Sequence, residues 1–325
     1  MTDKLIRSTT TRRGFVYSYY HNVPSTGKPT ILFLHGFPST HSDWASQISF
    51  FSGKGYGVIA PDLLGYGGTS APDDVSHYRM LNMAEDIIDI FGDLGVDKVI
   101  GVAHDWGSIL LSRLLNTHSD RFLGAAFLVL GYVAPQADID NDVQHTVFDE
   151  PVDDIWGYFK FFAANDTPAL IEKHASIDSF YSLVFPNDPL IWKTDLAPLD
   201  KAKQWIEQNK QLPRADFWTH EQKEEHKKAL LKKGLRGPCN WYGAALAETN
   251  KADEALIAPE AHRVNVPTFY GAALKDYFCL AQVTKQTMGS LCSSVTTKDF
   301  ETSHWVMLEA SDELNDALEQ FFDSL

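Results

Sequence analysis

The pattern of hydrophobic and polar positions predicts short buried strands that alternate with helices. Residues 99–103 form a continuous apolar run, which is typical of a strand buried on both faces of a parallel sheet. Residues 108–115 are too rich in Leu for a surface helix and predict a buried one. Further strands are expected at residues 14–23, 30–34, 57–61, 124–130, 264–270 and 293–300.

Helices are expected between these strands. Residues 42–51 and 78–94 carry apolar side chains at helical spacing, and a last helix is expected from about Ser311. Because strands and helices alternate, we expect an α/β protein whose mostly parallel sheet is covered by helices on both faces.

The pattern changes after Gly131. Residues 136–154 are polar and acidic, and residues 155–261 contain helices and loops, many aromatic side chains and no convincing strand. We therefore expect residues 1–135 and 262–325 to form the core domain. Residues 136–261 are expected to form an inserted helical lid (cap) domain, with some of its aromatic side chains lining an apolar pocket.

Composition narrows the classes of partner. With 325 residues, of which 44% are hydrophobic, the chain can bury a large core. Its net charge of -15 without a basic block argues against nucleic acid and membrane surfaces as partners.

The cysteines Cys239, Cys279 and Cys292 lack a CxxC spacing and cannot all pair, which indicates reduced thiols. Without an apolar leader or a run long enough to cross a bilayer, a cytoplasmic location is expected. The oligomeric state stays open, a homodimer included.

A sharp turn, His104-Asp105-Trp106-Gly107, lies between the apolar strand at residues 99–103 and the Leu-rich helix. The small residues Ala103 and Gly107 lie two positions before and after its central residue. This is the pattern of a nucleophile elbow, where the central side chain is exposed at the carboxyl end of a sheet. The central residue is Asp105 rather than Ser or Cys. A carboxylate can displace a leaving group at an sp3 carbon and form an ester that activated water then hydrolyses. Epoxide opening or dehalogenation is therefore expected, unless Asp105 merely caps the helix.

Another loop is expected at the same edge of the sheet. His35-Gly36-Phe37-Pro38 ends a strand and can direct the Phe37 N–H to the point faced by the Trp106 N–H, which would form an oxyanion hole. We also predict a cis Phe37–Pro38 bond in this tight turn.

Asp276 and His304 each follow a predicted strand, in the order nucleophile, acid, histidine. His304 would take a proton from water, and Asp276 would fix its tautomer and stabilise the imidazolium. Asp299 is a rival acid, although it lies within a predicted strand. His104 is expected to be a structural hydrogen-bonding group rather than a second base.

These motifs, together with Ser303-His304-Trp305, resemble the soluble epoxide hydrolase branch of the α/β-hydrolase fold over nearly the whole chain. The resemblance implies an eight-stranded sheet with the lid between its sixth and seventh strands. The elbow motif is shared with haloalkane dehalogenases, so the lid must discriminate. Epoxide hydrolases of this branch hold the epoxide oxygen with two lid tyrosines, which the resemblance assigns to Tyr242 in Asn240-Trp241-Tyr242 and to Tyr158, with Tyr181 as the rival of Tyr158.

The chain is therefore expected to convert a small apolar epoxide and water to a vicinal diol, with no metal or organic cofactor. A phenol can protonate the alkoxide of ring opening and is itself neutral at pH 7. Substrate contacts are expected from Trp106, Phe37, Trp241, Trp156, Tyr158 and Tyr242. One alternative is a haloalkane dehalogenase, in which Trp106 and a lid Trp hold the halide. Another is a non-catalytic receptor that binds a small ligand under the lid.

Overall fold

Eight strands form one sheet in the computed structural model, which describes residues 5–135, 156–247 and 249–325. The strands are β1 (Ile6–Thr10), β2 (Val16–Asn22), β3 (Thr30–Leu34), β4 (Gly57–Pro61), β5 (Val99–His104), β6 (Phe122–Leu128), β7 (Thr268–Ala273) and β8 (Val295–Phe300). Their order is β1-β2-β4-β3-β5-β6-β7-β8. The β1–β2 and β2–β4 pairs are antiparallel, and the remaining pairs are parallel. The predicted α/β class with a mostly parallel eight-stranded sheet is confirmed.

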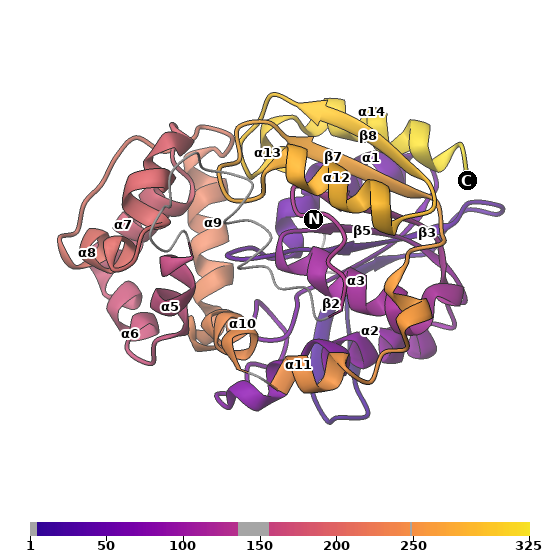
Figure 1. Ribbon diagram of the computed structural model, residues 1–325, viewed down its shortest axis with the longest axis horizontal. Coiled ribbons are helices and arrows are strands. Elements are labelled where there is room, and N and C mark those ends of the chain that lie inside the picture. The colour runs from indigo at the N-terminus through magenta and orange to yellow at the C-terminus, as the bar shows by residue number, and fades with distance from the viewer. Residues whose placement is uncertain (1–4, 136–155, 248) are drawn as a thin grey trace.

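Helices cover both sides of this sheet. Those in the sheet-forming parts of the chain are α1 (Ala45–Gly53), α2 (Met80–Leu94), α3 (Trp106–His118), α12 (Ala281–Leu291), α13 (Val306–Glu309) and α14 (Ser311–Phe322). Helices α1 and α14 lie on one side, and α2 and α3 lie on the other (Figure 1). Every residue of β3, β4 and β5 is buried as a result, which explains why these strands are continuous apolar runs.

Strands β1 and β7 depart most from the prediction, and the other strands differ from it only by small shifts of their ends. Strand β1 was not predicted because its five residues are mostly polar and partly exposed at the sheet edge. Strand β7 begins at Thr268 rather than Val264. Val264 makes only an isolated bridge to Cys292, and Pro267, which has no N–H to donate, separates it from the strand.

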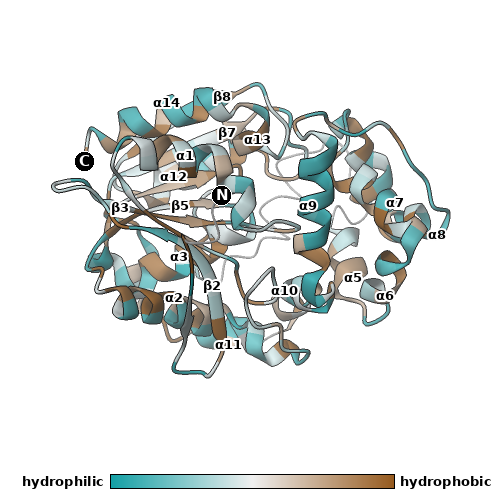
Figure 2. Cartoon of the chain, turned by 180° about the vertical axis from the view of Figure 1, so that it is seen from behind, coloured by the Kyte–Doolittle hydropathy of each residue, from teal (hydrophilic) through white to brown (hydrophobic). Residues whose placement is uncertain are grey.

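Between β6 and β7 the described residues form helices and loops, with no strand longer than a single bridge. The helices are α5 (Gly157–Ala163), α6 (Thr167–Glu172), α7 (His174–Val184), α8 (Lys201–Glu207), α9 (His220–Leu230), α10 (Arg236–Leu246) and α11 (Thr249–Glu254). Helices α5 to α9 lie beyond one end of the sheet, and α9 is hydrophilic along most of its visible face (Figures 1 and 2). The expected start of the lid at residue 136 lies outside the described residues, and the division into domains stays a prediction.

Within the described ranges, no helix has the length and apolar character that crossing a bilayer requires.

Candidate active site

Asp105 occupies the turn between β5 and α3 in a backbone conformation that few side-chain-bearing residues adopt, with φ 53° and ψ -125°. Its side chain makes no capping hydrogen bond to α3. Instead, Oδ1 accepts a hydrogen bond of 2.8 Å from the Phe37 N–H, and the Trp106 N–H also bonds to this carboxylate. The helix-cap alternative is therefore wrong. Strained backbone at a turn of this kind is typical of functional sites.

Two glycines allow this turn to form against the neighbouring loop. A Cβ atom at Gly36 would overlap Asp105 Oδ1, and one at Gly107 would overlap the carbonyl oxygen of Leu34. The close approach of the two segments brings the Phe37 N–H to the carboxylate. The predicted cis Phe37–Pro38 bond is also confirmed.

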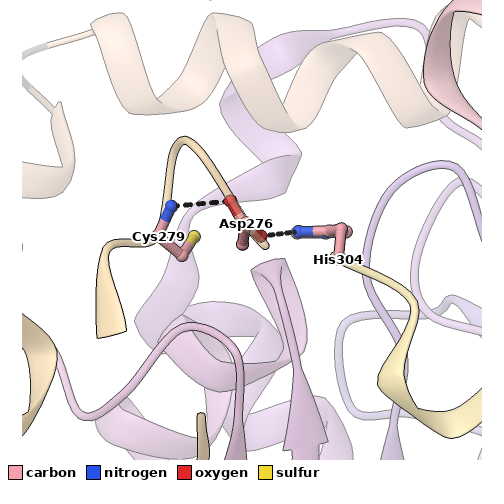
Figure 3. Close-up of side chains that lie close together, drawn as sticks. All are labelled: Asp276, Cys279 and His304. Atoms are coloured by element: carbon pink, nitrogen blue, oxygen red, sulfur yellow. Dashed lines mark hydrogen bonds and ion pairs between the residues drawn. The ribbon is translucent and has the colours of Figure 1, made fainter. Parts of the chain in front are cut away.

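The Asp276 carboxylate and the His304 imidazole meet at the carboxyl edge of the sheet, after β7 and β8. The Nδ1 of His304 donates a hydrogen bond of 2.6 Å to Asp276 Oδ2 (Figure 3). Asp276 Oδ1 accepts hydrogen bonds from the N–H groups of Phe278 and Cys279, at 2.7 and 2.9 Å. These contacts fix the carboxylate, which in turn fixes the imidazole. The Nε2 of His304 lies 3.6 Å from Asp105 Oδ2, beyond direct hydrogen-bonding distance.

The electrostatics of the three groups differ. Burial raises the pKa of Asp105, although His304 and the N–H groups of Phe37 and Trp106 favour its charged form. Burial also disfavours charge on Asp276 and His304, but their mutual attraction outweighs it. The pKa of Asp276 is therefore lowered and that of His304 is raised. Asp276 holds Nδ1 of His304, and the other ring nitrogen, Nε2, faces Asp105.

An apolar cavity lies above Asp105. Its aromatic lining consists of Phe37, Trp106, Trp156, Tyr158, Phe159, Phe162, Trp192, Tyr242, Phe278 and Trp305. Aliphatic side chains and Cys279 complete the wall, and among its described lining residues there is no Lys or Arg. The charge in this wall comes from Asp105 and His304. Such a cavity, mostly apolar with a few converging polar groups, is typical of a small-molecule site.

Two phenols face this cavity from different helices, Tyr158 from α5 and Tyr242 from α10. Their ring centroids are 6.1 Å apart. Burial raises the pKa of both phenols well above 10, and the Asp105 carboxylate raises it further. Both hydroxyl groups are therefore protonated at neutral pH and can donate hydrogen bonds.

Tyr181 lies elsewhere. Its hydroxyl is hydrogen-bonded to His226 Nδ1 at 2.6 Å, and His226 Nε2 lies 3.2 Å from Asp43 Oδ2. Tyr181 is fully buried and is not among the described residues that line the cavity. Of the two candidates for the second lid tyrosine, the geometry favours Tyr158.

One predicted substrate contact must be corrected. Trp241 does not line the cavity, because its indole N–H donates a hydrogen bond of 2.9 Å to the carbonyl oxygen of Leu64. Successive residues of an α-helix point about 100° apart, and of these two neighbours in α10 only Tyr242 belongs to the cavity lining. The other predicted contacts, from Phe37, Trp106, Trp156 and the two tyrosines, all belong to the lining.

The remaining candidates have structural surroundings. His104 is completely buried, and its Nε2 donates a hydrogen bond of 2.8 Å to the backbone carbonyl of His304. Burial holds the pKa of His104 well below its ordinary value, so its imidazole stays neutral and anchors the His304 loop. The rival acid Asp299 pairs at the surface with Lys285, at 2.6 Å.

Five aromatic residues of the wall were not among the predicted substrate contacts: Phe159, Phe162, Trp192, Phe278 and Trp305. Phe278 and Trp192 stack with their ring centroids 5.4 Å apart, and both line the cavity. A usable signal existed for Phe278, which lies two residues after Asp276 in a loop already expected at the site. Trp192 was one of many aromatic residues in the inserted segment, and nothing in the sequence distinguished it.

A sheet of this topology, with a sharp turn at Asp105 between β5 and α3, defines a hydrolase-type fold, and the comparisons with known proteins agree. The family model described as alpha/beta hydrolase fold matches residues 29–311. The chain therefore belongs to the alpha/beta hydrolase fold family.

Relatives with this architecture are named as epoxide hydrolases. The chain is 24% identical over 302 residues to bifunctional epoxide hydrolase 2 of Rattus norvegicus, covering 92% of this chain and 52% of that protein. It is 26% identical over 308 residues to an epoxide hydrolase of Caballeronia sordidicola, covering 90% of this chain and 87% of that protein. A crystal structure of an epoxide hydrolase from Vigna radiata matches all of both chains with a TM-score of 0.77 at 21% identity, which shows the shared fold. The chain spans about half the length of the rat protein.

Proposed function

We propose that this protein hydrolyses uncharged apolar epoxides to vicinal diols. The observation that carries the proposal is the convergence of a carboxylate, Asp105, and two protonated phenols, Tyr158 and Tyr242, on one aromatic cavity. The relatives named as epoxide hydrolases support it. An anionic substrate is disfavoured because the cavity wall, as far as it is described, holds carboxylate charge and no Lys or Arg.

The first step forms an ester on the enzyme. Asp105 Oδ2 attacks one epoxide carbon while Oδ1 stays hydrogen-bonded to the Phe37 N–H, and the Trp106 N–H also bonds to this carboxylate. The carbon–oxygen bond breaks, and Tyr158 or Tyr242 transfers its phenolic proton to the departing oxygen. The products of this step are an alkyl ester of Asp105, a hydroxyl group on the substrate and a tyrosinate.

The second step releases the diol. His304 Nε2 takes a proton from water, which attacks the Asp105 carbonyl carbon, and Asp276 stabilises the imidazolium that forms. The N–H groups of Phe37 and Trp106, which already bond to the Asp105 carboxylate, stabilise the oxyanion. When the tetrahedral intermediate collapses, the bond between the Asp105 carbonyl carbon and Oδ2 breaks, and the departing alkoxide takes the proton of the added hydroxyl and leaves as the diol. The proton held by His304 returns to the tyrosinate, and Asp105 keeps one oxygen atom from water.

The proposed reaction takes place between the inserted segment and the sheet-forming part of the chain. We assign residues 136–261 to a lid domain and residues 1–135 and 262–325 to the core domain, because α5 and α10 supply the two phenols and β5, β7 and β8 lead into the other groups. A cytoplasmic location is proposed because Cys239, Cys279 and Cys292 are all free thiols.

A direct assay separates this function from dehalogenation at the same carboxylate. The purified protein should form phenylethanediol from styrene oxide and release no halide from 1-chlorobutane or 1-bromobutane. Halide release without diol formation would assign the site to haloalkanes instead. Thermal stabilisation by styrene oxide without turnover, unchanged in Asp105→Ala, would indicate a receptor.

Loss of either cavity phenol is expected to slow the reaction, whereas loss of the Tyr181 phenol is not. Tyr158→Phe and Tyr242→Phe should each slow ester formation, and the double variant should lose about 10²- to 10⁴-fold, the usual value of a positioned proton donor. Tyr181→Phe is the matched control, because Tyr181 bonds to His226 instead of facing the cavity. Stopped-flow measurement of the first turnover tests this. Equal rates in all four variants would remove the phenols from the mechanism.

The pH dependence should follow His304. Burial lowers the pKa of His304, but the Asp276 carboxylate raises it by more, so ester hydrolysis should fall on acidification from a point above pH 6.5. In Asp276→Asn this acidic limb should move to lower pH, and the plateau rate should drop by up to about 10⁴-fold. Asp299→Asn serves as the control with an unchanged profile. A limb that stays fixed in Asp276→Asn would mean that another group titrates.

A further inference from the structure

Cys279 lines the cavity beside the Asp276–His304 pair (Figure 3). Its Sγ, an imidazole nitrogen of His304 and a carboxylate oxygen of Asp276 all lie within 4.8 Å of one another. The mechanism above makes no use of this thiol. We propose that Cys279, His304 and Asp276 form a binding site for a thiophilic divalent cation, with Zn²⁺ and Cd²⁺ as the fitting class, and that occupancy inhibits the enzyme.

The donor set suits such an ion. Thiolate, imidazole and carboxylate are the protein ligands of Zn²⁺, at about 2.3, 2.0–2.1 and 2.0–2.2 Å. Tetrahedral bonds of these lengths require ligand atoms roughly 3.5 Å apart, so small side-chain rotations are sufficient. Cys279 and Asp276 share one loop, in which the Cys279 N–H donates to Asp276 Oδ1, and this bond keeps the two side chains together. The cavity supplies the fourth position, open to water or a small anion.

The local charge also favours a cation. Two carboxylates, Asp276 and Asp105, interact electrostatically with Cys279, and no Lys or Arg is found in the described cavity wall. Burial and these charges raise the pKa of the Cys279 thiol, which is therefore protonated when no ion is bound. Binding of the ion must release this proton to solvent, as is general for thiol ligands. The bound dication would then compensate charges that the protein leaves close together.

Coordination would disable His304 as a base. Nδ1 is the imidazole nitrogen on the Asp276 side, and it now carries a proton that it donates to Asp276 Oδ2. When Nδ1 binds the ion through its lone pair, the neutral ring must carry its proton on Nε2. Nε2, which faces Asp105, could then no longer accept a proton from water. This consequence for activity rests on the proposed function, whereas binding of the ion does not.

The test is a titration of the full-length protein with Cd²⁺, followed in two ways. Ultraviolet absorbance reports the cadmium–thiolate bond without substrate, and diol formation from styrene oxide reports inhibition, each variant being normalised to its own uninhibited rate. Cys279→Ala is compared with Cys292→Ala, which removes a buried thiol that does not belong to the described cavity wall. Thermal unfolding shows that both variants are folded.

We expect one cadmium–thiolate band per chain in the wild type and in Cys292→Ala, absent from Cys279→Ala and removed by a chelator. Outer partners of metal ligands are already worth about 10- to 100-fold in affinity, so losing the thiolate should raise the half-inhibitory Cd²⁺ concentration at least about 10-fold. Equal sensitivity of all three proteins, or a band that persists in Cys279→Ala, would refute the site. A band with no effect on a working enzyme would refute inhibition alone, and a wild type that binds Cd²⁺ but hydrolyses no epoxide would contradict the proposed function alone.

Discussion

Asp105→Ala is expected to abolish diol formation, with a loss of at least about 10⁴-fold in kcat, comparable to the loss of a principal catalytic group in other hydrolases. The reason is that no other described side chain in the cavity offers an ionised oxygen to an epoxide carbon. Initial rates with styrene oxide measure the effect.

The same variant should fold normally. Burial raises the pKa of Asp105 in the folded protein, so its negative charge at pH 7 opposes folding, and its removal should leave the Tm unchanged or higher. Asp299→Ala removes a surface carboxylate and serves as the activity control. If Asp105→Ala kept a tenth or more of the wild-type rate, Asp105 could not be the nucleophile.

His304→Gln is expected to separate the two chemical steps. Glutamine has no basic nitrogen, so ester formation should continue while ester hydrolysis slows by about 10²- to 10⁴-fold, the usual contribution of a general base. Intact-protein mass spectrometry after mixing with styrene oxide should show one covalent adduct per chain, located on the Asp105 peptide. Slow steady turnover with no adduct would mean that His304 acts before or without an ester.

Asp105→Ala is the control for the adduct itself. It should remain unmodified under the same conditions, because it lacks the carboxylate that forms the ester. Alkylation of any other nucleophile, Cys279 included, would give an adduct of the same mass on a different peptide.

The sheet and the elbow could be predicted from the sequence because each rests on local patterns. Strands covered on both faces are continuous apolar runs, as in β5, and a Cβ atom at Gly107 after the Asp105 turn would overlap the carbonyl oxygen of Leu34. The placement of Asp276 and His304 followed from topology, since the carboxyl ends of parallel strands meet at one edge of the sheet.

The residues of the cavity wall were harder to predict from the sequence, because they depend on how the helices face one another. Trp241 and Tyr242 are neighbours in the sequence, yet one bonds to the Leu64 carbonyl and the other lines the cavity. Trp192 stacks on Phe278 across a separation of more than eighty positions, which no local pattern encodes. The polar edge strand β1 escaped prediction for a related reason: its register is set by pairing with β2, not by burial of its own side chains.

The central claim is that the Asp105 carboxylate, and not water, forms the first bond to the epoxide carbon. A single turnover in H₂¹⁸O, with enzyme in excess over styrene oxide, followed by mass spectrometry of the Asp105 peptide and of the diol, tests it most directly. We predict ¹⁸O in the Asp105 side chain and none in the diol, because water attacks the ester carbonyl. A labelled diol with unlabelled Asp105 would contradict the account and require direct attack of water on the epoxide.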